Sequence, residues 1–357
     1  MGFRSSIVAI VTMAAAVLVS AAPRPVKVLV LYDMEGVSEA TSVKHTSFDT
    51  PEYRAARVSL TADVNAAIAG LKAAGIAEIV VVDGHGSGNV LEPDVLEDRL
   101  LAPAKMIARD APFDIYMDSY DHSIDAIVAV AMHAGAGNNT GFLSHTYSGV
   151  AVDYRVNGAP FNETMILARG AARLKIPVVA VSGDDQLEKE LGRNLPWVQY
   201  ATVKHAVDRA KAEPLARGEI DRRIAAAAKA GIEKLDAARL PEVAGPYRFA
   251  VTFHDDAESG NAALFPGAET ALNARTVQVR ANDFEEGYRR SLRLLSLAGI
   301  AARETALRAV MATAPDAESW RARIGDWGEQ RFIGLATPPP PPPSLASTGK
   351  ARYFGAR

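Results

Sequence analysis

Residues 26–36 read VKVLVLYDMEG, a short aliphatic run that ends in two acids. Three later runs are equally apolar: EIVVVD at 78–83, AIVAVAM at 126–132 and PVVAVS at 177–182. Runs that are apolar on both faces are typical of parallel strands covered by helices. The Ala-rich stretch 51–75, between the first two runs, has helical spacing. The sequence therefore predicts an α/β fold, with a mostly parallel sheet flanked by helices.

The second half of the chain has a different pattern. Leu143 to Val156 leads into Asn157-Gly158, a strong two-residue hairpin signal, and a helix is expected from Pro160 to Leu174. Beyond Ala206 the apolar residues tend to alternate, which favours a smaller C-terminal α+β lobe. The expected organisation is a signal peptide (1–21), an N-terminal α/β lobe (22–206), a C-terminal α+β lobe (207–320) and a proline-rich disordered tail (321–357).

Composition excludes several classes of protein and site. The chain has 39 Lys and Arg residues against 42 Asp and Glu, and this net charge of −3 gives no reason to expect nucleic acid as a partner. It has no cysteine, so disulfides, thiolate nucleophiles and Cys-ligated zinc are excluded. Any metal ion must be bound by His, Asp and Glu.

The N-terminus has the three parts of a secretory signal. Met1 to Ser6 carries Arg4, Ile7 to Val19 is uncharged and apolar, and Val19-Ser20-Ala21 offers the small residues that signal peptidase requires. The apolar run is shorter than the roughly 20 residues of a membrane span. We therefore expect a cleaved signal, no stable membrane insertion after cleavage, and export to a bacterial periplasm.

Acids and histidines follow three of the predicted strands. Asp33 and Glu35 follow the first, Asp83 and His85 the second, and His133 the third. Any one of them has an ordinary explanation as a turn residue or a hydrogen-bonded core histidine. Together they should meet at one edge of a parallel sheet, and the set exceeds what one tetrahedral ion needs. This pattern predicts a metal centre, in which Asp83 either orients His85 or forms the turn.

Motifs along most of the chain then match a known family. They run in order from Val26 to about Ala301 and include Asp33-Met-Glu-Gly36, Asp83-Gly-His85, His133, Ser144-His145, Glu163, Ser182-Gly-Asp-Asp185, Val203-Lys204 and Leu264-Phe-Pro-Gly-Ala-Glu269. In these residues the chain resembles the zinc-dependent D-aminopeptidase family.

The resemblance implies two Zn²⁺ ions per subunit. Asp33 would be shared by both ions, Glu35 and His85 would complete one site, and His133 and Glu163 the other. His145 occupies the position of the family's catalytic histidine. Glu163 follows from the resemblance alone, since by spacing it is only an acid in a first helical turn.

The resemblance also implies an activity. The chain would be an exported dizinc aminopeptidase that removes N-terminal residues, D-amino acids in particular, from short peptides or amides by means of metal-activated water. Family members form rings, so a ring-like homo-oligomer is expected. The stretch from Leu91 to Asp121 is longer than the usual link in the family, which makes substrate preference the property most open to change.

Two alternatives belong to other functional classes. One is a periplasmic solute-binding protein, which would need no metal. The other is a dizinc amidase or esterase that acts on non-peptide substrates. Zinc analysis distinguishes the first from a hydrolase, and substrates with a blocked amine distinguish the second from an aminopeptidase.

Overall fold

The computed structural model describes residues 26–335, apart from 49, 89–91, 108–113, 243, 272–273 and 312–316. The predicted signal segment at 1–21 and the run of prolines at 338–343 lie outside the described residues. The same holds for parts of the long 91–121 link. Among the helices that the structure does describe, none is both long and apolar enough to cross a bilayer.

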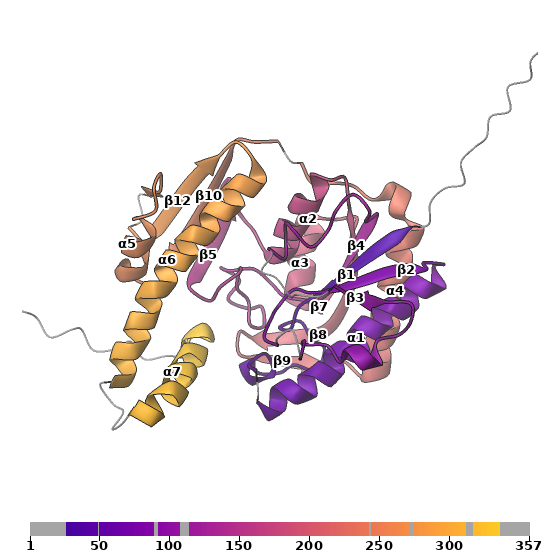
Figure 1. Ribbon diagram of the computed structural model, residues 1–357, viewed down its shortest axis with the longest axis horizontal. Helices are drawn as coiled ribbons and strands as arrows, with labels where there is room; N and C mark the ends of the chain where they lie inside the picture. The colour runs from indigo at the N-terminus through magenta and orange to yellow at the C-terminus, as the bar shows by residue number, and fades with distance from the viewer. Residues whose placement is uncertain are drawn as a thin grey trace, which may run out of the picture.

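The larger sheet contains the aliphatic runs found in the sequence (Figure 1). Its strands, in spatial order, are β3 (Lys105–Met106), β2 (Glu78–Asp83), β1 (Lys27–Tyr32), β4 (Ala126–Met132), β7 (Val178–Asp184), β8 (Gln199–Asp208) and β9 (Lys211–Pro214). All neighbours pair in parallel except β8 and β9. The chain goes from β1 to β2 on one side and later to β4 on the other, so β1 and β4 flank a topological switch point, where α/β proteins bind ligands.

Helices cover both faces of this sheet. One face packs on α1 (Pro51–Ala73) and α4 (Arg217–Glu233), and the other on α2 (Glu163–Ala172) and α3 (Asp185–Asn194). Successive residues of β1 point into different cores: Val28 and Val30 face the α1 side, whereas Leu29 and Leu31 face the other. Burial on both faces explains why the strands are apolar without alternation.

A second, antiparallel sheet forms the other lobe. Its order is β11 (Glu269–Thr270), β12 (Thr276–Ala281), β10 (Tyr247–Phe253), β5 (Ala151–Val156) and β6 (Ala159–Pro160). The long helix α6 (Phe284–Met311) packs on it, beside α5 (Asp256–Ala262) (Figure 1). The α/β class with a mostly parallel, helix-flanked sheet and a smaller α+β lobe is confirmed.

The boundary between the lobes differs from the one expected near Ala206. That residue lies inside β8, and α4, which follows it, covers the parallel sheet. The predicted hairpin forms at Asn157-Gly158, whose φ angles are +52° and +87°, but its first strand, β5, pairs with β10 of the C-terminal lobe. Each lobe thus contains chain segments from both sides of the expected boundary, because long-range strand pairing overrides the order of the sequence.

The C-terminal region also differs from the prediction. Helix α6 is continuous to Met311, and a further helix, α7 (Ala317–Phe332), occupies part of the segment expected to be a disordered tail. Figure 1 shows α7 beside α6, with its C-terminal end directed toward the middle of the molecule.

Candidate metal centre

The ends of β1 and β4 come together through a close backbone contact. Gly36 donates its N–H to the main-chain oxygen of Ala131 at 2.8 Å. A Cβ atom at Gly36 would lie only 2.1 Å from the main-chain oxygen of Met132, so no other residue fits there. The turn after Glu35 therefore lies directly on the strand end that carries His133.

Asp33, His133 and Glu163 form the deeper part of the site. The Nε2 atom of His133 lies 3.3 Å from Oδ2 of Asp33 and 3.5 Å from Oε2 of Glu163. All three side chains are buried. Glu163 reaches them because α2 begins there, with Asn162 as its N-cap accepting the N–H of Met165 at 2.9 Å.

Glu35 and His85 form the second part. The Nε2 atom of His85 lies 3.2 Å from Oε1 of Glu35. On the other side of the ring, Nδ1 lies 3.5 Å from Oδ2 of the buried Asp94. Asp83 instead accepts the backbone N–H groups of His85 and Gly86, at 2.9 and 2.8 Å. Asp83 thus forms the turn, and Asp94 is the carboxylate beside the His85 ring.

The donor set fits a cation. Asp33, Glu35 and His133 each offer a ligand atom within 4.8 Å of the others, and so do His133, His145 and Glu163. In the part of the chain that the structure describes, Oδ2 of Asp33, Oε2 of Glu35 and Nε2 of His133 are buried without a hydrogen-bond partner. Buried polar atoms rarely lack partners, and three that converge on one place indicate a ligand that binds all of them. Carboxylate and imidazole atoms are suitable ligands for zinc.

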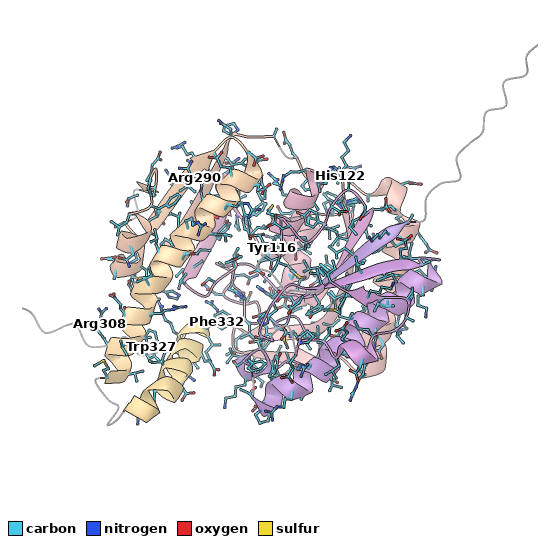
Figure 2. All side chains as sticks on the ribbon, viewed as in Figure 1. Tyr116, His122, Arg290, Arg308, Trp327 and Phe332 are labelled. Carbon is cyan, nitrogen blue, oxygen red and sulfur yellow. The ribbon has the colours of Figure 1, made fainter. Side chains whose placement is uncertain are left out.

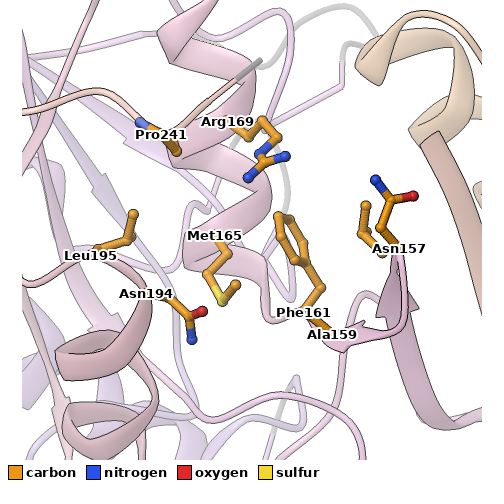
Figure 3. A pocket seen from close by; sticks show the side chains of 9 residues that line it. Asn157, Ala159, Phe161, Met165, Arg169, Asn194, Leu195 and Pro241 are labelled. Atoms are coloured by element: carbon orange, nitrogen blue, oxygen red, sulfur yellow. The ribbon is translucent and has the colours of Figure 1, made fainter. Parts of the chain in front are cut away.

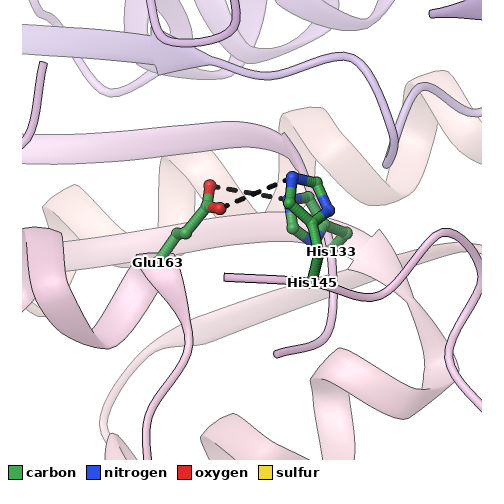
Figure 4. A group of neighbouring side chains, drawn as sticks. All are labelled: His133, His145 and Glu163. Atoms are coloured by element: carbon green, nitrogen blue, oxygen red, sulfur yellow. Dashed lines mark ion pairs between the residues drawn. The ribbon is translucent and has the colours of Figure 1, made fainter. Parts of the chain in front are cut away.

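His145 lies over this cluster (Figure 4). Its ring stacks on His133 with centroids 4.2 Å apart and an interplanar angle of 8°. Nδ1 lies 2.9 Å from the main-chain oxygen of Leu143, so this nitrogen carries the proton and Nε2 is left as a base. Nε2 lies 3.7 Å from Oε1 of Glu163. The structure therefore places His145 beside His133 and Glu163, two of the five predicted ligands.

The charges of the cluster depend on one another. Burial and the nearby Glu35 charge raise the pKa of Asp33 to about 7. Burial opposes ionisation of Glu163, but the charge of His133 outweighs it and lowers the Glu163 pKa to about 2. Burial likewise disfavours charged His133, yet the carboxylates of Glu163 and Asp33 raise its pKa well above the usual value. Such mutual perturbation within one buried group is typical of a functional site.

His145 behaves differently from His133. Burial and the charge of His133 lower the pKa of His145. The side chain of His145 is 13% exposed, against 1% for His133. A neutral imidazole at the open side of a charged cluster is suited to proton transfer rather than to an ion pair.

Sequence reasoning missed two side chains that hold the predicted ligands. The hydroxyl of Tyr116 donates to Oε2 of Glu163, and Asp94 lies beside His85. Both belong to the stretch between Leu91 and Asp121, which has no periodic pattern. The backbone N–H of Tyr147 also donates to Glu163, at 2.5 Å.

Two cavities lie away from this cluster. One of about 260 Å³ lies beside α2 and is lined by Phe161, Met165 and Arg169 among others (Figure 3). Another, of about 770 Å³, is lined partly by residues 135–140 and by Glu190. None of the six predicted site residues lines either cavity.

Known proteins resemble this chain over the same region. A family model described as D-aminopeptidase matches residues 26–292. The D-aminopeptidase of Bacillus subtilis (strain 168) is 26% identical over 275 residues, which cover 76% of this chain and 97% of that protein. The solved structure of the Zn-dependent D-aminopeptidase DppA from Bacillus subtilis, a self-compartmentalizing protease, matches with a TM-score of 0.69 at 25% identity, covering 76% of this chain and 98% of that one. The matched region contains the whole cluster and ends before α7.

Proposed function

This chain belongs to the D-aminopeptidase family and is a zinc-dependent metallopeptidase, and we propose that it binds two zinc ions per subunit and removes N-terminal D-amino acids from short peptides or amides. The family is one of enzymes, so the solute-binding alternative is set aside. The observation that carries the proposal is the convergence, within one cluster, of three buried ligand atoms without a hydrogen-bond partner among the described residues, on Asp33, Glu35 and His133.

The ligand assignment follows the two parts of the cluster. Asp33 lies between them and would serve both ions, Glu35 and His85 would complete one site, and His133 and Glu163 the other. Bound zinc supplies a Lewis acid that polarises a carbonyl and makes water a better nucleophile at neutral pH. Asp94 and Tyr116 orient His85 and Glu163, as residues behind metal ligands commonly do.

His145 would move the proton during hydrolysis. With Nδ1 held by the oxygen of Leu143, Nε2 is the nitrogen that can accept a proton from water and pass it to the departing amine. Burial lowers the pKa of His145 and so favours the neutral ring. Stacking on His133 fixes the ring plane, so that Nε2 remains directed at the cluster.

Assembly and location form part of the same proposal. DppA is a self-compartmentalizing protease, and this supports a ring-like homo-oligomer for the present chain. Residues 1–21 support export to a bacterial periplasm. Peptides that contain D-amino acids are the substrates that agree with the family.

A small panel of substrates tests the proposal. Zinc-loaded protein is given D-alanine amide, L-alanine amide and N-acetyl-D-alanine amide. The proposal predicts hydrolysis of the D-amide, slower hydrolysis of the L-amide, and none of the acetylated compound. Equal rates with and without a free amine would instead identify an amidase that acts on other substrates.

A further inference from the structure

Helix α7 lies outside the segment that matches the family, yet its last residue, Phe332, contacts His145 beside the candidate metal centre. Figure 2 labels Trp327 along this helix and Phe332 at its C-terminal end, which points toward the middle of the molecule. The last turns of α7 contact the loop after β1, helix α5 and the segment that carries His145.

Two polar contacts fix the position of α7. The hydroxyl of Ser47, in the loop after β1, donates to Oε1 of Glu329 at 2.8 Å. Arg331 forms an ion pair with Glu258 of α5, whose side chain is fully buried. Separating the Arg331–Glu258 pair would leave an uncompensated buried charge. Together, the two contacts join α7 to both lobes, through Ser47 on one side and Glu258 on the other.

Phe332 is the residue of α7 that reaches the site. Its ring meets the His145 ring edge to face, with centroids 5.2 Å apart and an interplanar angle of 81°. It also packs against Gly149, where an added Cβ would lie 2.8 Å from the Phe332 ring. The guanidinium carbon of Arg209 lies 5.5 Å from the centroid of the same Phe332 ring. Phe332 thus occupies space directly beside the imidazole proposed to protonate the leaving amine.

We propose that α7 is a wall of the substrate site and that Phe332 limits the size of the group that leaves. This inference rests on the proposed aminopeptidase activity and specifies its substrate class: short peptides or amides in which the group after the scissile bond is small. A bulky leaving group would have to displace a side chain that is held by Gly149 and Arg209 and by the anchored helix.

The test compares leaving groups in the full-length, zinc-loaded protein. Values of kcat/KM are measured for D-alanine amide and D-alanine p-nitroanilide with wild type, Phe332→Ala and Phe332→Trp. Leu335→Ala is the matched control, since Leu335 follows the same helix and is 66% exposed. We expect Phe332→Ala to shift the ratio about tenfold toward the anilide, a typical effect of added pocket volume. Phe332→Trp should shift it the other way, and Leu335→Ala should leave it unchanged.

A second measurement does not depend on hydrolysis. If α7 covers the cluster, a chelator such as dipicolinate should remove zinc several-fold faster from Phe332→Ala than from wild type or Leu335→Ala. Unchanged ratios and unchanged chelation rates in Phe332→Ala would overturn the role of α7. A different result would separate the two proposals. If wild type hydrolyses neither compound but Phe332→Ala still releases zinc faster than wild type, then α7 does cover the cluster and the proposed substrate class is wrong.

Discussion

The ammonium group of Lys204 donates a 2.6 Å hydrogen bond to the main-chain oxygen of Glu35. The same group bonds the main-chain oxygens of Val37 and Ala40, at 2.8 and 3.0 Å, and lies 4.3 Å from the centroid of the Phe142 ring. Lys204 is completely buried in β8. A single side chain thus holds the loop that carries two of the proposed zinc ligands.

Lys204→Met should weaken both the fold and the metal site. Methionine fills the space but leaves the three loop carbonyls without their donor, so the free energy of unfolding should fall by about 2–4 kcal/mol. Zinc affinity should fall as well, because Glu35 loses its fixed position. Urea unfolding of metal-free protein and zinc titration measure the two effects. Lys229→Met, on the exposed face of α4, is the control and should change neither. A Lys204→Met protein with wild-type zinc affinity would contradict the positioning role.

Tyr116→Phe tests whether the hydroxyl of Tyr116 orients the Glu163 carboxylate. The substitution removes one hydroxyl that donates to Oε2 and keeps the ring. Loss of such a contact typically reduces metal affinity by about 10–100-fold. Competition with a chromogenic chelator measures the affinity, and Tyr120→Phe is the matched control, since its hydroxyl bonds the main-chain oxygen of Tyr116 instead. Equal zinc affinity in the two variants would show that Tyr116 does not orient the ligand.

Substitution of Asp33 and substitution of His145 should have different effects on bound zinc and on activity. Asp33→Ala removes the ligand proposed for both ions, so bound zinc and activity should disappear together. His145→Ala should keep its zinc and lose at least about 100-fold in kcat, the usual scale of general acid–base catalysis. Metal analysis and D-alanine amide hydrolysis are measured on the same samples, with the exposed His122→Ala as control. A near-normal rate in His145→Ala would exclude its proposed role.

Zinc affinity should fall steeply as the pH drops. Without a cation, the carboxylates raise the pKa values of His85 and His133 well above the usual value, despite the opposing effect of burial. Both imidazoles then carry protons at pH 7 that zinc must displace, and Asp33, with a pKa of about 7, is partly protonated as well. Binding should therefore release about two to three protons per chain. The affinity should decrease at least about a hundredfold for each pH unit below 7. Calorimetry in buffers of different ionisation enthalpy counts the protons, and an affinity that is constant between pH 6 and 7 would contradict this protonation scheme.

Four of the proposed ligands could be predicted from local pattern. Asp33, Glu35, His85 and His133 follow apolar strands, and the carboxyl ends of parallel strands share one edge of the sheet. Glu163 and His145 could not be derived in this way. Their positions depend on how the chain between β4 and α2 folds back, and in the sequence only the family resemblance indicated them.

The parts that sequence reasoning missed depend on distant contacts. The Asn157-Gly158 turn was predictable from its residues, but the pairing of β5 with β10 joins residues 93 to 102 positions apart, from Val156 with Phe249 to Ala151 with Phe253. No local pattern encodes such a pairing. Asp94 and Tyr116 lie in an aperiodic link. Helix α7 has few apolar residues in its described part, and its stability depends on contacts such as Arg331 with Glu258.

Anomalous X-ray scattering from crystals of the zinc-loaded protein, recorded on both sides of the zinc absorption edge, tests the central claim most directly. Two zinc peaks per subunit are expected, one between Asp33, Glu35 and His85 and the other between Asp33, His133 and Glu163. A single peak, or zinc bound away from these five side chains, would contradict the claim.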